Sequence, residues 1–416
     1  MDAARLYPTI SAGELQQILH ARNGEMALLD VREEGAFADG HILLASSLPL
    51  SQLDSGIALL VPRKATLIIL CDDGVGLAQT AHQRLTALGY ENVVILDGGM
   101  PGWTSDNHEI FAGVHVPTKA LGLFAQRELS IPEISPNEYA RLEEDGSRFL
   151  VLDCRPFSEY QRGTIPAALN SPGMETVHQM HGIEGGTHLV MSCAGRTRGL
   201  IAAQTLRDFG FQGNISALRG GTMSWALSGR AIRKDASQSW KPKCPAKAPG
   251  RDIVTSLAHR AQISILDAAA CEQWKSDKSR TFYTFDIRQY AEYEAGHIPG
   301  ARHVPGAQLI HAFDRFVGTR GARIVLSDDD GVRAAGTALW LRRMGWKDVG
   351  IIYISAFADL ERGPSLPEGN PGGMAATPVS TAPDRPAMQA YLARSDDLLE
   401  KVARDGTLPL AAIAVN

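Results

Sequence analysis

Short apolar runs alternate along this chain with longer stretches in which apolar residues recur every three or four positions. One combination, an apolar run followed by Asp-x-Arg and then by Gly-His-Ile or Gly-Thr-Ile, occurs three times, and its Asp-to-Gly offset is ten residues in every copy. A constant offset of this kind indicates internal repeats. The copies are LLDVREEGAFADGHI ending at Ile42, VLDCRPFSEYQRGTI ending at Ile165 and TFDIRQYAEYEAGHI ending at Ile298.

Each copy lies within a longer unit of similar order. A helix-start signature precedes it, Ser11 with Glu14, Ser135 with Glu138 and Ser264 with Asp267. A second apolar run (TLIIL, HLVMS, RIVLS), a short polar loop, an Ala/Leu-rich helical stretch and a third run (VVIL, ISAL, GIIYI) follow. Strands that alternate with helices pair in parallel, so we predict an α/β fold of three tandem doubly wound sheets.

Pro-rich segments separate the units. We expect a first unit at 1–118, a second at 119–234, a linker at 235–252 and a third unit at 253–365. Residues 366–416 are expected to form a Pro/Gly-rich linker and then an amphipathic helix of about 18 residues. We expect this helix to pack back on a domain. A membrane or partner helix is the alternative, although its polar face carries as many acids as bases.

Composition excludes several classes of function. The net charge of −5, from 41 basic and 46 acidic residues, offers no extended basic surface for nucleic acid. No apolar stretch approaches the roughly 18 residues of a membrane span. The N-terminus lacks the basic region and apolar run of a signal peptide. Five cysteines with neither C-x-x-C nor zinc spacing indicate a reducing compartment and no metal site. We therefore expect a cytoplasmic protein without a membrane or nucleic-acid partner.

The loop after the second apolar run of the second unit, SCAGRTRG, carries the candidate chemistry. It places Cys193 at the start of a helix, with Gly195, Arg196 and Arg198 following. A helix N-terminus offers unpaired N–H groups and partial positive charge. Each arginine at about 5 Å would favour the thiolate by on the order of 1–3 kcal/mol. We predict that Cys193 is a nucleophile in an anion cradle rather than an inert buried thiol.

The remaining cysteines are expected to have no such role. Cys154 follows the Asp of the repeated motif, where the other units have Val31 and Ile287, and we expect it to lie in the core. Cys244 lies in the linker and Cys271 on a helix. Cys71 occupies the loop of the first unit and is a secondary candidate, but Asp72 and Asp73 follow it and would raise its pKa and repel an anionic donor.

The repeated motif, the loop cysteine and a G-G-x-x-x-W segment together resemble tandem rhodanese-like domains over residues 5–365, in particular a bacterial multi-domain subgroup with the same CAGRTR loop. The segment spans Gly98–Trp103 and Gly220–Trp225, and 32 residues separate cysteine from tryptophan in both units (71 to 103, 193 to 225). The resemblance implies a sulfurtransferase that needs no cofactor. A donor such as thiosulfate or 3-mercaptopyruvate gives a sulfane sulfur to the loop cysteine, and the persulfide passes it to cyanide, a thiol or a protein thiol.

By this resemblance, Cys193 carries the sulfur, the loop amides hold the persulfide, and Arg196 and Arg198 steer a small anionic donor. The loop residues concerned are Ala194, Gly195, Arg196, Thr197, Arg198 and Gly199. The third unit reads LSDDDGVRA and places Ser327 or Asp328 where the cysteine should be. We expect that unit to be structural or recognitional and dispensable for chemistry.

Two other functions compete with this one. A cysteine phosphatase or arsenate reductase would need five residues between cysteine and arginine to encircle a phosphate, whereas four separate Cys193 from Arg198. A non-catalytic scaffold or redox-sensing module would fit the altered loops of the other units. It predicts that Cys193 accepts no sulfur from any donor.

Overall fold

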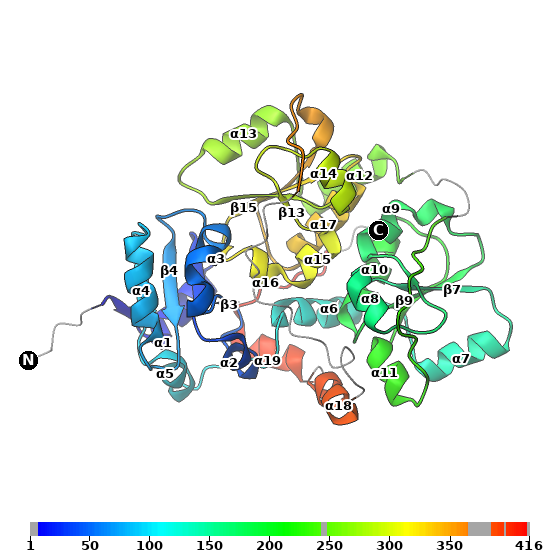
Figure 1. Cartoon of the computed structure of the whole chain (residues 1–416), viewed down its shortest axis with the longest axis horizontal. Coiled ribbons are helices and arrows are strands. Elements are labelled where there is room, and N and C mark those ends of the chain that lie inside the picture. Colours follow the sequence, from blue (N-terminus) through cyan, green and yellow to red (C-terminus); the bar gives the residue numbers. More distant parts are fainter. Residues whose placement is uncertain (1–6, 243–247, 365–383, 395–396, 414–416) are drawn as a thin grey trace, which may run out of the picture.

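The computed structural model describes residues 7–242, 248–364, 384–394 and 397–413. It contains three separate sheets, in which all strands pair in parallel except for one strand at the edge of the first sheet, and each sheet is flanked by helices. Figure 1 shows the first unit in blue, the second in green and the third in yellow. This arrangement confirms the predicted α/β class. Cys244 lies outside the described residues.

The first unit has the strand order β1-β5-β4-β2, and β3 pairs with the outer side of β2. The Ser11–Glu14 capping box at the start of α1 is present as predicted. The elements are β1 (Thr9–Ile10), α1 (Ala12–Ala21), β2 (Met26–Asp30), α2 (Glu34–Asp39), β3 (Ser46–Ser47), the 3-10 helix η1 (Leu50–Gln52), α3 (Leu53–Leu60), β4 (Leu67–Cys71), α4 (Leu77–Ala87), β5 (Val93–Leu96) and α5 (Gly99–Ser105).

The second unit repeats this order as β6-β10-β9-β7-β8, and α6 (Val116–Glu128) connects it to the first. The capping box of Ser135 and Glu138 opens α7. The elements are β6 (Glu133–Ile134), α7 (Pro136–Glu144), β7 (Phe149–Asp153), α8 (Phe157–Arg162), β8 (Leu169–Asn170), α9 (Gly173–His178), η2 (Met180–Gly182), β9 (His188–Ser192), α10 (Thr197–Asp208), β10 (Ile215–Leu218) and α11 (Gly221–Leu227).

The third unit has the order β11-β16-β15-β12-β13. Ser264 begins β11 rather than a helix, because residues 264–266 pair with β16, and Asp267 caps the helix instead. The elements are α12 (Arg251–Ala261), β11 (Ser264–Leu266), α13 (Ala268–Ser276), β12 (Phe282–Asp286), α14 (Tyr290–Ala295), β13 (Arg302–His303), α15 (Gly306–His311), α16 (Phe313–Phe316), β14 (Thr319–Arg320), β15 (Arg323–Asp328), α17 (Val332–Arg343), β16 (Val349–Tyr353) and η3 (Ile354–Ala356).

A buried Asp–Arg pair explains the repeated motif. In the second unit Arg155 donates to both carboxylate oxygens of Asp153, and its Nη2 also donates to the carbonyl of Gly163 at 2.6 Å. The arginine therefore ties the end of a central strand to the turn ten residues on, which accounts for the constant spacing. The same three bonds join Asp30, Arg32 and Gly40 in the first unit and Asp286, Arg288 and Gly296 in the third.

The third unit is attached to both other units, by strand pairing on one side and by side-chain contacts on the other. Strand β14 pairs antiparallel with β2 and so extends the first sheet, which the sequence did not predict. On the other side, Arg343 of α17 forms a bidentate pair with Asp208 of α10 at 2.6 and 3.0 Å, with both side chains almost fully buried. Nearby, the indole N–H of Trp340 donates to Thr205 Oγ1 at 2.8 Å.

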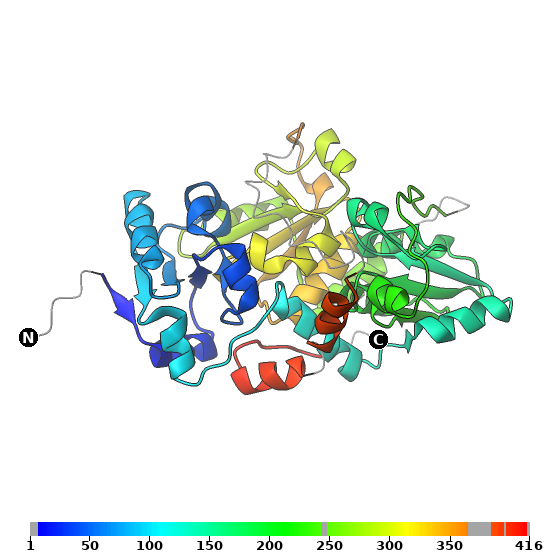
Figure 2. The same ribbon diagram turned by 60° about the horizontal axis from the view of Figure 1, so that its bottom comes forward.

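The C-terminal segment forms two helices, α18 (Arg385–Ala393) and α19 (Leu398–Asp405), rather than the single predicted one. Arg394 is the C-cap of α18, and Asp397 is the N-cap of α19. Helix α18 contacts α11 and α19 contacts α6. Figure 2 shows both on one side of the molecule, beneath the junction of the units. The prediction that this segment packs back on a domain is therefore confirmed.

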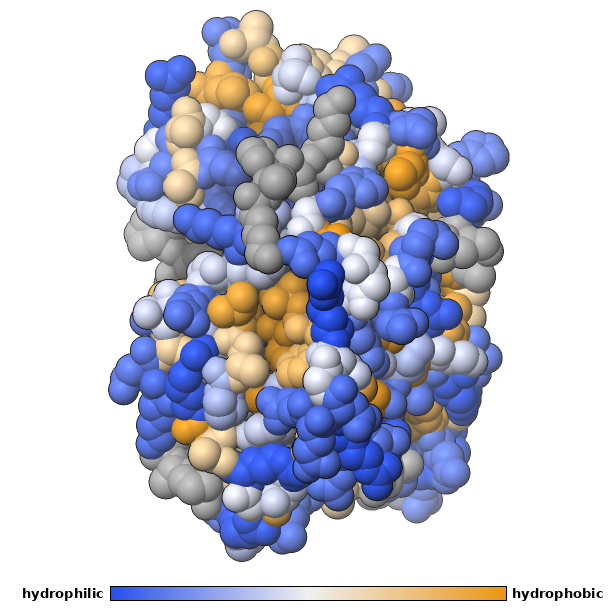
Figure 3. Space-filling view, turned by 90° about the vertical axis from the view of Figure 1, so that its right-hand side faces the viewer, coloured by the Kyte–Doolittle hydropathy of each residue, from blue (hydrophilic) through white to orange (hydrophobic). Residues whose placement is uncertain are grey.

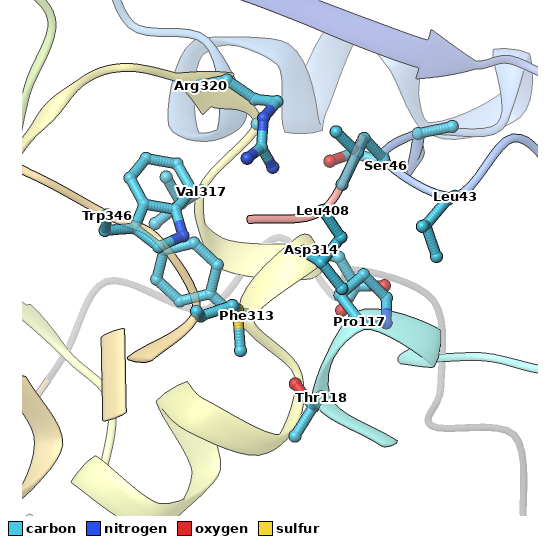
Figure 4. A pocket seen from close by; sticks show the side chains of 14 residues that line it. Leu43, Ser46, Pro117, Thr118, Phe313, Asp314, Val317, Arg320, Trp346 and Leu408 are labelled. Atoms are coloured by element: carbon cyan, nitrogen blue, oxygen red, sulfur yellow. The ribbon is translucent and has the colours of Figure 1, made fainter. Parts of the chain in front are cut away.

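A small cavity lies where the first and third units meet α6 and the C-terminal segment. Figure 4 shows Thr118, Asp314 and Trp346 among the residues around it. Its volume of about 30 Å³ has room for little more than a water molecule. No helix in the described part of the chain is both long and apolar enough to cross a bilayer.

The Arg343–Asp208 pair should be essential for joining the second and third units. Asp208→Asn leaves the buried guanidinium without a counter-charge, which typically costs about 3–5 kcal/mol. We expect that loss in the free energy of unfolding from urea titration. The exposed pair of Arg84 and Asp54, 3.7 Å apart, supplies the control, and Asp54→Asn should cost about 0–1 kcal/mol. Equal losses in the two variants would contradict the assignment.

Candidate functional site

Cys193 lies between the end of β9 and the first turn of α10, and only 2% of its surface is exposed. A hydrogen bond from Cys154 is the largest influence that lowers the pKa of Cys193 below its ordinary value. Burial opposes this, while the charge of Arg198 and the backbone N–H of Gly199 lower the pKa further. These groups together lower the pKa of Cys193 despite its burial, and the largest influence among them, Cys154, lies outside the loop.

The second glycine of the G-G-x-x-x-W segment, Gly221, packs directly against the Cys193 loop. Gly221 has φ of +53°, and a Cβ placed there would lie 2.2 Å from the carbonyl oxygen of Cys193. The backbone N–H groups of Thr222 and Met223 donate to the carbonyls of Cys193 and Ala194 at 2.8 and 3.0 Å. Only a glycine permits this approach, since any side chain would push the loop away. The segment is thus a support for the loop.

The two loop arginines are both ion-paired. Arg198 forms a buried bidentate pair with Glu159 at 2.7 and 2.8 Å, beside Cys193. Arg196 instead pairs with Glu133 on β6 at 2.9 and 3.1 Å. Arg198 is thus positioned to act on the thiolate, whereas capture of an anionic donor by Arg196 stays a prediction that its pairing does not favour.

The other predicted loop residues are covered by elements from elsewhere in the chain. Ala194 packs in an apolar cluster with Met223 and Met388 of α18. The ring of Tyr391 lies against Gly195, where an added Cβ would be 3.0 Å from Cε1. Thr197 meets Gly122 of α6, where an added Cβ would be 2.6 Å from Thr197 Cγ2. Gly199 packs close to the carbonyl of Met191, 3.1 Å from an added Cβ.

Cys154 is a site residue that the sequence analysis missed. It is buried, as predicted, but it lies beside Cys193 because β7 and β9 pair in register, with Asp153 opposite Ser192. Its backbone N–H donates to the carbonyl of Ser192 at 2.9 Å, and its Sγ lies 3.0 Å from the same oxygen. Its own pKa is raised well above the ordinary value, chiefly through its hydrogen bond to Cys193. The sequence did offer a signal: Cys154 directly follows the motif aspartate at the end of the strand next to the one that leads into the Cys193 loop.

The structure places Asp72, not Cys71, at the position equivalent to Cys193. Cys71 pairs with Asp30 across β4 and β2, as Ser192 pairs with Asp153, and its Sγ faces the carbonyl of Leu29. Burial raises the pKa of Cys71 well above its ordinary value. The equal cysteine-to-tryptophan distance was misleading, because the first unit has one residue fewer between loop and tryptophan. Sulfur transfer by Cys71 stays a prediction that this placement does not favour.

Aspartates occupy the cradle in the first and third units. The Asp72 carboxylate accepts N–H bonds from Gly74, Gly76 and Ala78 at 2.8–3.2 Å. Asp328, rather than Ser327, takes the same place in the third unit and accepts from Ala334 N at 3.1 Å. Ala78 and Ala334 each follow their aspartate by six residues, as Gly199 follows Cys193.

The third unit also retains an ion pair like that of the second. Arg333 follows Asp328 by five residues, as Arg198 follows Cys193, and it pairs with Glu292 as Arg198 pairs with Glu159. Arg333 additionally bonds Asp329. Asp329, Asp330 and His178 lie close enough together to suit a cation, but the Arg333 guanidinium already neutralises this group, so we assign no metal to it.

A cavity of about 970 Å³ lies between the second and third units. Cys154, Glu159 and Arg198 line it from the second unit, and Gln308, Arg315 and Phe316 from the third. The expectation that the third unit is dispensable for chemistry is therefore not favoured, because that unit forms a wall of this cavity. Figure 3 looks onto the side of the second unit, where a largely hydrophilic surface surrounds an apolar area near the middle.

Comparisons with known proteins agree with this geometry. The model of the rhodanese-like domain matches residues 11–106, 135–228 and 267–356. The crystal structure of a thiosulfate sulfurtransferase from Pseudomonas aeruginosa has a TM-score of 0.87 and 30% identity, covering 98% of this chain and 100% of that one.

Two curated relatives match shorter segments. Thiosulfate sulfurtransferase GlpE of Shewanella oneidensis is 30% identical over 98 residues, 24% of this chain and 93% of the relative. An HTH-type transcriptional regulator of Mycobacterium tuberculosis is 31% identical over 132 residues, 31% of this chain. The match spans 56% of the regulator's own length.

Gly221→Ala should disrupt the Cys193 loop specifically. Gly229, with φ of +83° and no atom within 4 Å of an added Cβ, provides the matched control, since alanine at either position carries a left-handed strain of about 1–2 kcal/mol. Only Gly221→Ala should also move the Cys193 loop. The pH profile of Cys193 alkylation should then shift to higher pH in Gly221→Ala and not in Gly229→Ala. Identical profiles would contradict the proposed support.

Proposed function

This chain belongs to the rhodanese-like family, and we propose that it is a sulfurtransferase that works through a persulfide on Cys193. One observation carries the proposal. Among the cysteines that the structure describes, Cys193 alone lies at a helix N-terminus beside an arginine that lowers its pKa. The Pseudomonas and Shewanella relatives named as thiosulfate sulfurtransferases support the reaction class.

The first half-reaction loads the sulfur. With thiosulfate as donor, the Cys193 thiolate attacks the outer sulfur, a new S–S bond forms, the donor's S–S bond breaks, and sulfite leaves with the bonding pair. The charge that was on the thiolate moves to the outer sulfur of the persulfide. The helix N-terminus and its amides stabilise negative charge at this place, because their N–H groups are otherwise unpaired.

Arg198 serves the thiolate rather than binding the donor directly. Its guanidinium is already held by both oxygens of Glu159, so little of its charge remains for a second anion. Its position nevertheless lowers the pKa of Cys193. Arg198 is in this sense a positioning residue, fixed by Glu159 next to the sulfur that reacts.

The second half-reaction delivers the sulfur to an acceptor. A thiolate or cyanide attacks the outer sulfur of the persulfide, and the Cys193 thiolate leaves. The cavity of about 970 Å³ between the second and third units is lined by Cys154 and Arg198, the neighbours of Cys193, and it is within the range of small-molecule sites and far larger than cyanide requires. Its size favours an acceptor thiol that carries further groups, such as a peptide or a protein side chain.

Intact-mass analysis tests the persulfide. After incubation with thiosulfate, and separately with 3-mercaptopyruvate, the Cys71→Ser variant should take one sulfur atom per chain from the donor, seen as release of sulfite or pyruvate and as a persulfide in samples quenched early, because Cys71 faces a backbone carbonyl away from the cradle. Cys193→Ser should gain none. Uptake by Cys193→Ser would assign the sulfur to another residue, and failure of the wild-type chain with both donors would favour the scaffold or redox-sensing function.

Substitutions of the two loop arginines should have different effects on the pH dependence of Cys193 alkylation. Arg198→Gln removes a cation that favours the thiolate, so the rise of the alkylation rate with pH should move to higher pH by on the order of one unit. Arg198→Lys, which keeps the charge, should move it less. Arg196→Gln is the matched control and should leave the profile in place, because Arg196 pairs with Glu133. A profile unchanged in Arg198→Gln would remove this arginine from the mechanism.

A further inference from the structure

The second unit holds two thiols side by side. Cys154 and Cys193 each follow a residue of the in-register pair Asp153–Ser192, and the Cys154 S–H is directed at the carbonyl oxygen of Ser192, the residue before Cys193, at 3.0 Å. Neighbouring strands lie about 4.8 Å apart, which falls within the Cα separations of roughly 4.4–6.8 Å that a disulfide spans. Each cysteine lies one position beyond this pair, so the strand spacing there is of the size that a disulfide spans.

Both thiols occur in the unit with the persulfide cradle and are replaced in the other two. The strand-end position of Cys154 is Val31 in the first unit and Ile287 in the third. The cradle position of Cys193 is Asp72 in the first unit and Asp328 in the third. A core position that needed only a small apolar side chain would accept valine or isoleucine in the second unit as well. Of the three equivalent strand ends, only the one next to the reactive Cys193 carries a cysteine, Cys154.

We propose that Cys154 is a second reacting thiol, which attacks the Cys193 persulfide and releases its outer sulfur as sulfide. This inference rests on the proposed function, because it requires sulfur on Cys193. Cys154 Sγ bonds to Cys193 Sγ, and the bond between Cys193 Sγ and the outer sulfur breaks. The outer sulfur leaves with that bonding pair and takes the proton of the Cys154 thiol, so that one persulfide anion and one thiol become one disulfide and one hydrosulfide ion.

Regeneration needs a dithiol reductant, and the cavity gives it a route. Cys154 is among the residues that line the cavity of about 970 Å³, whereas Tyr391 of α18 covers the Cys193 loop at Gly195. A small dithiol, or the exposed dithiol of a redox protein, attacks Cys154 Sγ and frees the Cys193 thiolate. A second exchange within that reductant then releases Cys154 as a thiol, leaves the reductant oxidised and returns the chain to its starting state.

The test uses the reduced full-length chain, freed of added thiol and loaded with thiosulfate under anaerobic conditions. We expect the wild-type chain to release a stoichiometric amount of sulfide and to yield a Cys154–Cys193 cross-linked peptide on non-reducing peptide mapping. Cys154→Ser should instead keep a stable persulfide and release no sulfide. Cys71→Ser is the matched control, since it also removes a buried strand-end thiol, and it should behave as the wild type. Without thiosulfate, no cross-link should form.

The outcomes separate this inference from the proposed function. A wild-type chain that keeps its persulfide as long as Cys154→Ser does, with no sulfide and no cross-linked peptide, overturns the role of Cys154 and leaves the sulfurtransferase intact. No sulfur uptake by either protein overturns the proposed function itself. The peptide map of the wild-type chain decides the question even if Cys154→Ser does not fold, because it needs no variant.

Discussion

The buried pairing of aspartate and arginine at the end of each central strand is the constraint on which the rest of this structure depends. A buried charge is costly unless it is paired and hydrogen-bonded. In the second unit Arg155 satisfies Asp153 and the carbonyl of Gly163 at once. The Asp–Arg pair fixes the end of β7. Because β9 pairs with β7 in register, β9 ends at the same height in the sheet, and its loop begins there. The position of the Cys193 loop therefore depends on strand pairing and not on the sequence of the loop itself.

The same loop position at a helix N-terminus holds a cysteine in the second unit and an aspartate in the first and third units. Backbone N–H groups at a helix N-terminus stabilise an anion of any chemistry. In the second unit the side chain at this place is the thiol of Cys193, whose pKa is lowered, and in the others it is the carboxyl group of Asp72 or Asp328. A carboxylate saturates the donors and cannot accept sulfur. In the third unit the loop has become part of an interface instead, since Arg333 bonds Glu175 and Asp330 bonds His178, both on α9 of the second unit.

Features that depend on the local sequence pattern could be predicted from the sequence. Features that depend on contacts between residues far apart in the chain could not. Periodicity and the motif spacing predicted the repeats, the alternation of strands and helices, and the Cys193 loop. The equivalence of Asp72 rather than Cys71 depended on strand register and on a one-residue difference in loop length, which distance along the chain cannot separate. The contact of Cys154 with Cys193 and the addition of β14 to the first sheet join residues far apart in sequence, where no local preference acts.

Residues from more than one part of the chain enclose Cys193 and its loop. A thiolate that is 2% exposed needs compensation for lost solvation, and Arg198, the Gly199 amide and Cys154 supply it from within the second unit. The cover over the loop comes from outside that unit, because Gly122 of α6 and Tyr391 of α18 pack on it. The third unit forms a wall of the cavity that reaches Cys154. The boundaries between the sequence repeats are therefore not the boundaries of the site.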